Sequence, residues 1–314
     1  MKKIAIIGEC MIELNGEPFG SMNQTFGGDT LNAAVYLSRS CSEGVEIQYV
    51  TSMGTDALSE GMIQRWQQEG VGTDLVLRDN ARSPGLYLIQ TDETGERTFL
   101  YWRNQSAAKY MLRHHDFGEV EAALREMDMI FLSGITLAIL EPSDRKRLIA
   151  LLAELSSMGT EIAFDSNFRP ALWPDDANQT IQESYKALLE FCSLALITLD
   201  DEQAIWGDKT YQETLNRCKR FGTQKVVVKM GANGCVYQDF SRHKEPISVP
   251  TDIVRNVVDT TSAGDSFNGG FLASYLTGKD MRTACVNGNA LAGIVIQHRG
   301  AIVSKQETDM LIKG

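Results

Sequence analysis

The stretch MIFLSGITLAILEPSDRKRLIALLAELSSMGTEIAFDS, residues 129–166, decides the fold class. It begins and ends with continuous apolar runs, 129–134 and 161–166, which are typical of strands buried on both faces of a sheet. The segment between them, 142–159, has a proline near its start and a glycine at its end, a pattern that predicts a helix. Strand, helix and strand in this order predict a crossover between two parallel strands.

The same pattern extends to both ends of the chain. Further apolar runs at 4–8, 194–198 and 225–231 read as buried strands, and the segment from about 178 to 191 reads as a helix. The sequence therefore predicts an α/β fold with a parallel sheet covered on both faces. In such sheets ligands bind beyond the carboxyl ends of the strands.

Two segments break this alternation. Residues 83–108 contain two β-rich runs around DETGE (92–96), which is a hairpin signal. Residues 11–28 are polar and spaced by glycines, and they form a second candidate. We predict that the two segments form a small β-sheet beside the α/β body, with two separate surface hairpins as the alternative.

The bulk composition excludes several function classes. The 314 residues are 43% hydrophobic and carry a formal net charge of −11. An acidic chain argues against a general binder of nucleic acid or of anionic membranes, because both ligands attract excess Lys and Arg. It does not argue against binding of a small anion, because a few local hydrogen-bond donors are enough to bind one.

The chain shows no sign of export, membrane insertion or a metal centre. Its six cysteines are scattered without a C-x-x-C pair, and His114 and His115 are not part of a metal-ligand spacing. Glu9 and Glu13 interrupt the first apolar run, and no run approaches the roughly 20 apolar residues that span a bilayer. We expect a cytoplasmic protein with reduced thiols, bound neither to nucleic acid nor to a membrane.

One candidate site is DTTSAGDSFNGGF, residues 259–271. The small residues Ser262, Ala263 and Gly264 precede an apolar helical pattern, so an anion can approach the unpaired N–H groups at the helix start. Asp265 would lie beside that anion, where a carboxylate can take a proton from a hydroxyl that attacks phosphorus. The spacing is equally compatible with Asp265 as a simple helix cap.

A second candidate is FGGDTLNAA, residues 26–34. Its two glycines precede a predicted helix and permit close approach of the backbone, and Asp29 and Asn32 are short polar groups that can hold sugar hydroxyls. Taken alone, the segment is also compatible with a glycine-rich turn followed by a helix cap at Asp29 or Thr30.

Together the two segments resemble the paired signatures of the ribokinase-like carbohydrate kinases, the PfkB family, in order and in separation. The resemblance covers nearly the whole chain, and within the family it is greatest to kinases of the keto-deoxy sugar acid 2-keto-3-deoxy-D-gluconate. The stretches that carry this narrower likeness are IGECMIEL (7–14), FGGDTLN (26–32), PGLYLIQTDETGERTFLYWRN (84–104), FDSNFRPALW (164–173), TLDDE (198–202) and VIQHRGAI (295–302).

The resemblance implies a fold and a reaction. The fold would be a single ribokinase-like domain over residues 1–314, a three-layer α/β/α sandwich with a β-sheet lid formed by about 11–26 and 82–107. ATP would be the donor with Mg²⁺, a monovalent cation is a further candidate, and the sugar acid would be phosphorylated at its 6-hydroxyl. Asp265 would be the base, and the N–H groups of Ala263 and Gly264 the anion hole.

The resemblance also assigns binding residues. Gly28, Asp29, Asn32 and Asp265 would hold the sugar, and the nucleotide would be bound by a second set: Asn167, Thr198, Lys229, Gly231, Gly234, Ser262, Gly264 and Asn289. In many family members an Asn-x-x-Glu motif organises Mg²⁺ through water. Here Leu199 stands in place of that Asn, and only Glu202 of the motif is kept as the metal-associated residue. The acidic pair Asp200 and Asp201 is the alternative that could compensate for the missing Asn.

A sugar acid needs a pocket with cations and hydrogen-bond donors. Tyr101 and Arg103 are two residues apart on a predicted lid strand, Tyr87 lies on its partner strand, and Arg169 follows a buried strand. Arginine suits a carboxylate because its fork can bind two oxygens. We predict these four residues as sugar-acid ligands, although without the resemblance ordinary surface positions are the favoured interpretation of both arginines.

Three other functions compete with this one. A kinase of the same fold acting on fructose or ribose is the nearest rival. A dinucleotide-binding oxidoreductase is disfavoured because GECMIEL, not G-x-G-x-x-G, follows the first strand. A sugar sensor without catalysis is disfavoured because both the base and the anion hole are present. The lid is also predicted as a surface through which a homo-oligomer could form.

Overall fold

The computed structural model describes residues 1–17, 19–41, 43–91 and 97–312. Its main feature is a nine-stranded sheet with the order β13-β12-β11-β10-β9-β8-β1-β4-β5. The strands of this sheet are β1 (Lys2–Ile7), β4 (Val45–Gly54), β5 (Val76–Asp79), β8 (Met129–Ser133), β9 (Glu161–Asp165), β10 (Leu194–Thr198), β11 (Lys225–Lys229), β12 (Cys235–Asp239) and β13 (Ile247–Val249). All neighbours pair in parallel except at β12 and β13, which pair antiparallel at one edge.

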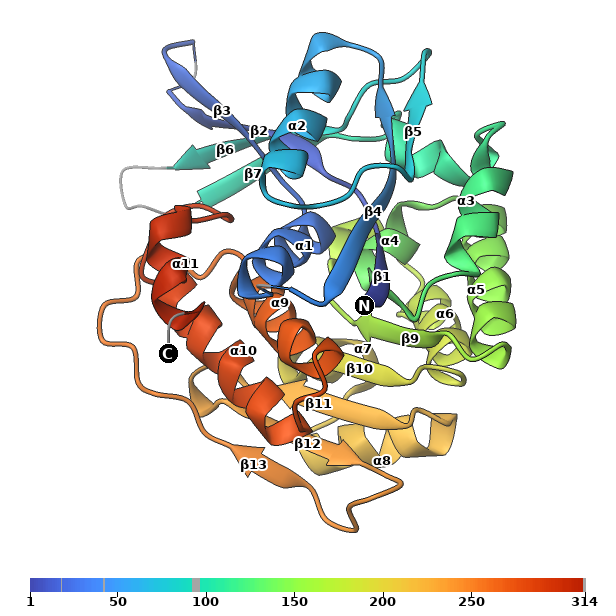
Figure 1. Ribbon diagram of the computed structural model, residues 1–314, viewed down its shortest axis with the longest axis vertical. Coiled ribbons are helices and arrows are strands. Elements are labelled where there is room, and N and C mark those ends of the chain that lie inside the picture. Colours follow the sequence, from blue (N-terminus) through green and yellow to red (C-terminus); the bar gives the residue numbers. More distant parts are fainter. Residues whose placement is uncertain (18, 42, 92–96, 313–314) are drawn as a thin grey trace.

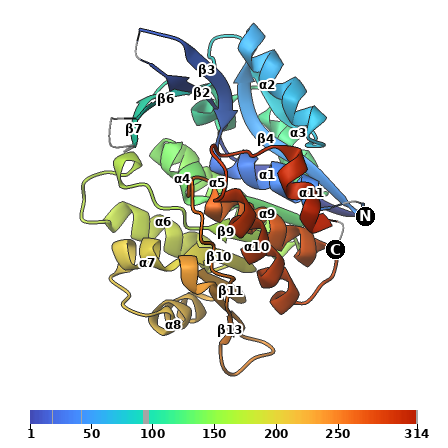
Figure 2. The same cartoon turned by 90° about the vertical axis from the view of Figure 1, so that its left-hand side faces the viewer.

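Helices cover both faces of this sheet (Figures 1 and 2). One face is covered by α1 (Asp29–Ser40), α2 (Ala57–Gln68), α9 (Ala263–Leu276) and α10 (Met281–Val295), and α11 (Lys305–Ile312) packs on α1 and α10. The other face is covered by α3 (Phe117–Leu124), α4 (Gly134–Ile139), α5 (Pro142–Ser157), α6 (Gln179–Leu189), α7 (Leu199–Trp206) and α8 (Tyr211–Phe221). The predicted three-layer α/β/α architecture is therefore confirmed.

Successive residues of the central strands enter opposite cores, which explains their continuous apolar runs. In β11, Val226 and Val228 pack into the core under α5 and α6, whereas Val227 packs into the core under α1 and α9. All three side chains are fully buried. A strand with one solvent-facing side would alternate polar and apolar residues instead.

A second, four-stranded sheet has the order β3-β2-β6-β7. Its strands are β2 (Met11–Gly16), β3 (Met22–Gly27), β6 (Leu86–Thr91) and β7 (Arg97–Trp102). The two hairpins join because β2 pairs in parallel with β6. The prediction of one small sheet is confirmed, and the alternative of two separate hairpins is wrong. The DETGE turn itself lies outside the described residues.

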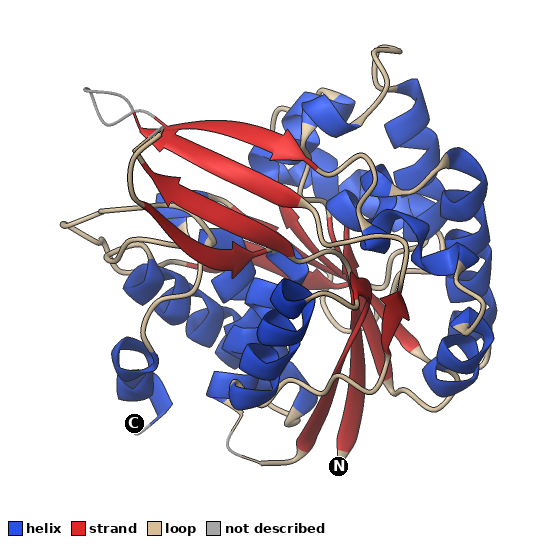
Figure 3. Cartoon of the chain, turned by 90° about the horizontal axis from the view of Figure 1, so that it is seen from above, coloured by secondary structure: helices blue, strands red, loops and turns tan. Residues whose placement is uncertain are grey.

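The smaller sheet lies at the upper end of the molecule in both Figure 1 and Figure 2, opposite β13. Figure 3 shows it from above as a separate layer beside the large sheet. The chain passes from β1 to β2 through Gly8, Glu9 and Cys10, and from β3 to α1 through Gly28 alone. None of the described helices is both long enough and apolar enough to cross a membrane.

Candidate active site

Two cavities lie against the carboxyl ends of the parallel strands. The first, of about 530 Å³, is lined by residues from the smaller sheet, from the ends of β9, β10 and β11, and from the starts of α1 and α9. The second, of about 390 Å³, lies between the 231–234 turn, the 251–260 loop and helices α9 and α10. This edge of the sheet is where ligands bind in open α/β folds.

The two cavities differ in chemistry. Polar side chains, among them Asp29, Asn32, Asp165 and Arg169, line the first cavity. The second is largely apolar, with Phe267 and the following aliphatic residues in its wall: Ile253, Val254, Val257, Ala292 and Ile296. The first cavity therefore suits a hydroxylated, charged ligand, and the second suits a flat heterocycle.

One wall is common to both cavities. Residues that line both are Thr198, Lys229, Thr260, Ala263 and Gly264. Two of them, Ala263 and Gly264, form the first turn of α9, so a helix N-terminus with its partial positive charge faces the junction. A group that passes from a ligand in one cavity to a ligand in the other would cross at this helix end.

Backbone geometry prepares this helix end for an anion. The N-cap residue Ser262 has φ 64°, in the left-handed region that non-glycine residues seldom occupy. The Ala263 N–H donates to Thr260 O at 3.2 Å, closing a turn before the helix. The Gly264 N–H has no acceptor within the described residues. Of the two N–H groups predicted as the anion hole, Gly264 is thus the one left free for a ligand.

Asp265 lies in the first turn of α9 and lines the first cavity only. Its carboxylate accepts a hydrogen bond from Asn32 Nδ2 of α1 at 2.9 Å. Burial and the charge of neighbouring Asp29 raise the pKa of Asp265 to about 7. The N-cap position belongs to Ser262, so the geometry does not favour the simple capping role that the sequence left open. A carboxylate that titrates near neutral pH can accept a proton and release it again.

The start of α1 supplies polar groups to the same cavity. Asp29 Oδ2 accepts from Asn167 Nδ2 at 2.6 Å, and burial raises the pKa of Asp29. Asn32 Oδ1 is buried and has no hydrogen-bond partner among the described residues. A buried acceptor without a partner is costly, which indicates that a ligand donor satisfies it.

Gly28 is required by a close approach of two backbones. A Cβ at this position would lie 2.2 Å from Glu9 O and 3.0 Å from Cys10 Cα. Any larger residue would push the start of α1 away from the segment that connects β1 to β2. The glycine therefore fixes where Asp29 and Asn32 stand, and its role is positional.

Aromatic and cationic residues close the first cavity from the side of the smaller sheet. Tyr87 and Tyr101 are directly paired across β6 and β7, with ring centroids 6.0 Å apart, and both line the cavity. Arg169 lines it from the loop after β9. Arg103 does not line it, because its guanidinium pairs with the buried carboxylate of Glu9 and lies 5.9 Å from the Tyr101 ring centroid.

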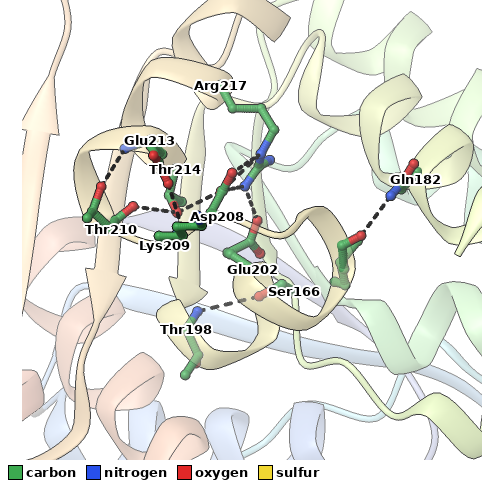
Figure 4. Close-up of polar contacts among 11 residues, drawn as sticks. Ser166, Gln182, Thr198, Glu202, Asp208, Lys209, Thr210, Glu213, Thr214 and Arg217 are labelled. Atoms are coloured by element: carbon green, nitrogen blue, oxygen red, sulfur yellow. Dashed lines mark hydrogen bonds and ion pairs between the residues drawn. The ribbon is translucent and has the colours of Figure 1, made fainter.

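Glu202, predicted to contact a metal through water, lines neither cavity. Figure 4 shows its carboxylate directed at Arg217 of α8, whose Nη2 lies 2.5 Å from Glu202 Oε2 and 2.6 Å from Asp208 Oδ2. Burial raises the pKa of Glu202 to about 7, and Arg217 opposes that rise. The acid of α7 that does line the first cavity is Asp201.

The structure brings nearly all predicted site residues to these two cavities. The first is lined by Gly28, Asp29, Asn32, Tyr87, Tyr101, Asn167, Arg169, Ser262 and Asp265, the second by Gly231, Gly234 and Asn289, and both by Thr198, Lys229, Ala263 and Gly264. Arg103 and Glu202 are the exceptions. The sequence analysis did not single out Asp165, which lines the first cavity, although an acid at the end of a buried strand was a signal for it. Nor did it single out Asn268 of α9, whose Nδ2 donates to Asp165 Oδ2 at 2.6 Å.

The chain is similar in sequence to known carbohydrate kinases, which agrees with a site made of two adjoining cavities. A family model described as pfkB family carbohydrate kinase matches residues 1–309. A 2-dehydro-3-deoxygluconokinase from Haemophilus influenzae is 55% identical over 308 residues, covering 97% of this chain and 96% of that protein.

Solved structures show the same fold. A fructokinase with bound ATP from Xylella fastidiosa superposes with a TM-score of 0.82 at 20% identity, covering 99% of this chain and 98% of that one. An Escherichia coli protein described as a putative ribokinase II in complex with ATP and Mg²⁺ gives a TM-score of 0.79 at 21% identity, with coverage of 100% and 99%. From the matched family model, the close relative and the two-cavity site together, the chain belongs to the pfkB family of carbohydrate kinases.

Proposed function

We propose that this chain is an ATP-dependent 2-dehydro-3-deoxygluconokinase, which phosphorylates 2-keto-3-deoxy-D-gluconate at its 6-hydroxyl. The activity of the Haemophilus influenzae relative supports the substrate. Phosphoryl transfer is supported by the residues that separate the two cavities. Gly264 lines both cavities, whereas Asp265 lines only the polar one. Acceptor and donor can thus meet at the start of α9.

The proposed reaction transfers one phosphoryl group between the cavities. The 6-hydroxyl oxygen of the sugar forms a bond to the γ-phosphorus while the bond to the β,γ-bridging oxygen breaks and ADP leaves. Asp265 takes the hydroxyl proton as this happens. The Gly264 N–H and the dipole of α9 stabilise the negative charge on the transferring group.

The sugar acid would be held by both the body and the smaller sheet. The unpartnered Asn32 Oδ1 would accept a hydrogen bond from a sugar hydroxyl, and Asp29 would accept another. The carboxylate would bind at Arg169 and Tyr101, with Arg103 as the next cation behind them.

The nucleotide would occupy the second cavity. Its apolar wall suits adenine, and the phosphates would reach Gly231, Gly234 and Gly264. When bound, Mg²⁺ would neutralise part of the phosphate charge. It is held largely by phosphate oxygens and water in such sites. Asp201 is the acid of α7 that fits contact through water, because Glu202 is already paired with Arg217.

A substrate panel tests this function. With ATP, kcat/KM should be highest for 2-keto-3-deoxy-D-gluconate, and Arg169→Ala should raise KM for it about ten- to hundredfold, because hydrogen bonds to charged groups contribute about 1.5–3 kcal/mol. The same variant should leave KM for a weak neutral substrate such as fructose within about threefold. Arg220→Ala, an exposed change on α8, is the matched control. Higher turnover of ribose or fructose by the unmodified chain would refute the substrate assignment.

The proposed base makes a pH prediction. Since Asp265 must be ionised to accept a proton, and its pKa is raised to about 7, kcat/KM for the sugar should fall roughly tenfold per pH unit below pH 7. Measuring kcat/KM from pH 5.5 to 9 at saturating MgATP gives this acidic limb of the pH profile. Asp29→Asn should move the limb to lower pH, since the charge of Asp29 contributes to the raised pKa. A limb that stays in place in Asp29→Asn would contradict this origin.

We also propose that the chain forms one catalytic domain in which the smaller sheet acts as a lid. Tyr87 and Tyr101 already face the first cavity from β6 and β7, so a bound sugar acid would contact them and hold the sheet in place. Hydrogen exchange with and without the sugar acid should show added amide protection in 86–91 and 97–102. Amides of α5, which lies away from the site, should not change. Equal exchange of the two strands in both states would rule out the lid role.

A further inference from the structure

Lys229 stands at the junction of the two cavities. It is the last residue of β11, its side chain is 8% exposed, and it lines both cavities. Among the described residues that line the nucleotide cavity, it is the only one with a cationic side chain. A buried lysine at this place requires partners, since an unpaired buried charge is strongly unfavourable.

Two side chains hold the ammonium group in place. Lys229 Nζ donates to Asp165 Oδ2 at 3.0 Å and to Asn268 Oδ1 at 3.2 Å, and Asn268 Nδ2 donates to the same Asp165 oxygen at 2.6 Å. The three residues come from β11, β9 and α9, and they form a closed hydrogen-bonded set. A cation fixed by three separate elements does not have to reorganise when charge develops next to it.

The fixed ammonium retains a free donor beside the proposed anion hole. An ammonium group has three N–H donors, and Asp165 and Asn268 use two of them. A Cβ built on Gly264 would lie 3.6 Å from Lys229 Nζ, which is ordinary van der Waals contact. The Gly264 N–H and the Lys229 ammonium therefore border the same small space. Asn268 stands three residues after Asp265, so the base and the lysine anchor share one face of α9.

We propose that Lys229 is a catalytic residue whose ammonium contacts the phosphoryl group during transfer and stabilises the charge on its oxygens, with Asp165 and Asn268 as its positioning residues. This inference rests on the proposed kinase function. Lysine serves here as a compact point charge that neither gains nor loses a proton in the step. Because the contact forms with the group in transit, its loss should lower kcat more than it weakens ATP binding.

Steady-state kinetics of Lys229→Met tests the inference. We expect kcat to fall about 10²–10³-fold, the usual effect of removing one preorganised donor, with KM for ATP changed less than about threefold. The affinity for ADP with aluminium fluoride in the presence of the sugar acid, measured by calorimetry, should fall by a factor similar to that of kcat. Lys225→Met is the matched control, because it lies on the same strand and outside both cavities. A raised KM for ATP with unchanged kcat would reduce Lys229 to a nucleotide ligand.

A second variant separates charge from structural support. Lys229→Met leaves Asp165 buried without a cation, which destabilises the fold, whereas Lys229→Gln keeps an amide that can donate to Asp165 and Asn268. We expect Lys229→Gln to melt close to the unmodified protein and still lose kcat. If its kcat stays within threefold of normal, hydrogen bonding alone suffices and the proposal is wrong. If the unmodified chain phosphorylates no sugar, the proposed function fails; if it does and both Lys229 variants keep kcat, only this inference fails.

Discussion

Asp265→Asn should lower kcat for sugar phosphorylation by about 10²–10⁴-fold, the range of a lost general base. The substitution keeps the shape of the side chain, and its Oδ1 can still accept the hydrogen bond from Asn32 Nδ2. What disappears is the capacity to take a proton from the sugar hydroxyl. A coupled assay that follows ADP release at saturating sugar acid and ATP measures the loss.

Two controls show that such a loss is chemical. Calorimetry should give a sugar affinity within a few-fold of the unmodified protein, because the contacts of Asp29, Asn32 and Arg169 are unchanged. The variant should also be at least as stable above pH 7. The raised pKa of Asp265 means that the folded state binds more protons than the unfolded state up to about pH 7, so the free energy of unfolding falls as pH rises through that window. Asparagine removes that dependence. Near-normal turnover would exclude Asp265 as the base.

Arg217→Met should lower the free energy of unfolding by about 3–5 kcal/mol, the cost of leaving a buried charge without its partner. The side chain of Arg217 is 6% exposed, and its guanidinium faces Glu202 and Asp208, whose side chains are 1% and 11% exposed (Figure 4). Its guanidinium also lies 4.5 Å from the ring centroid of Trp206. Methionine can retain that packing but not the ion pairs. Urea unfolding followed by circular dichroism gives the change.

Neighbouring variants isolate the ion pair as the cause. Arg220→Met changes an exposed arginine of the same helix and should be nearly neutral. The double variant Arg217→Met/Glu202→Gln should recover part of the loss, because it removes one of the two stranded carboxylates. If Arg217→Met and Arg220→Met unfold at the same urea concentration, the Glu202 pair does not support the fold.

This pair also bears on the family's metal motif. Glu202 is the motif's glutamate in TLDDE, but its carboxylate is directed to Arg217 of α8. Asp201, one residue earlier, lines the first cavity instead. On a helix, adjacent residues point about 100° apart, so one acid of the first turn can face the site while the next is buried behind it. A motif residue retained in sequence can thus have a structural partner.

The parts of the fold that the sequence predicted are those where a local pattern has one physical reading. The runs 161–166 and 225–231 are apolar on both faces, and β9 and β11 lie there, buried by two helical layers. The helix start at 262–265 was predicted because small residues before an apolar helical pattern leave N–H groups accessible. Both features depend on residues adjacent in the sequence, so they can be predicted without knowledge of the fold.

The residues that lie outside both cavities, and the partners that the sequence analysis did not single out, depend on contacts between distant parts of the chain. Arg103 pairs with Glu9, 94 residues away. The two-residue spacing of Tyr101 and Arg103, which predicted a sugar ligand, gives no information about that partner. Glu202 meets Arg217 because α7 and α8 pack together. The Lys229, Asp165 and Asn268 set unites three elements separated by up to 103 residues. Such partners become visible only when the sheet order is known.

The order in which the chain contributes residues to the site determines which segments can be changed to alter its acceptor preference. The residues proposed to hold the acceptor come from β3, α1, β6 and β7 in the first third of the sequence and from Arg169 after β9, whereas those proposed to act in phosphoryl transfer come from β11 and α9. Substitutions in the two hairpins can therefore alter acceptor preference while the transfer machinery keeps its geometry. The hairpin residues that line the first cavity are thus the first positions to vary when a different acceptor is sought.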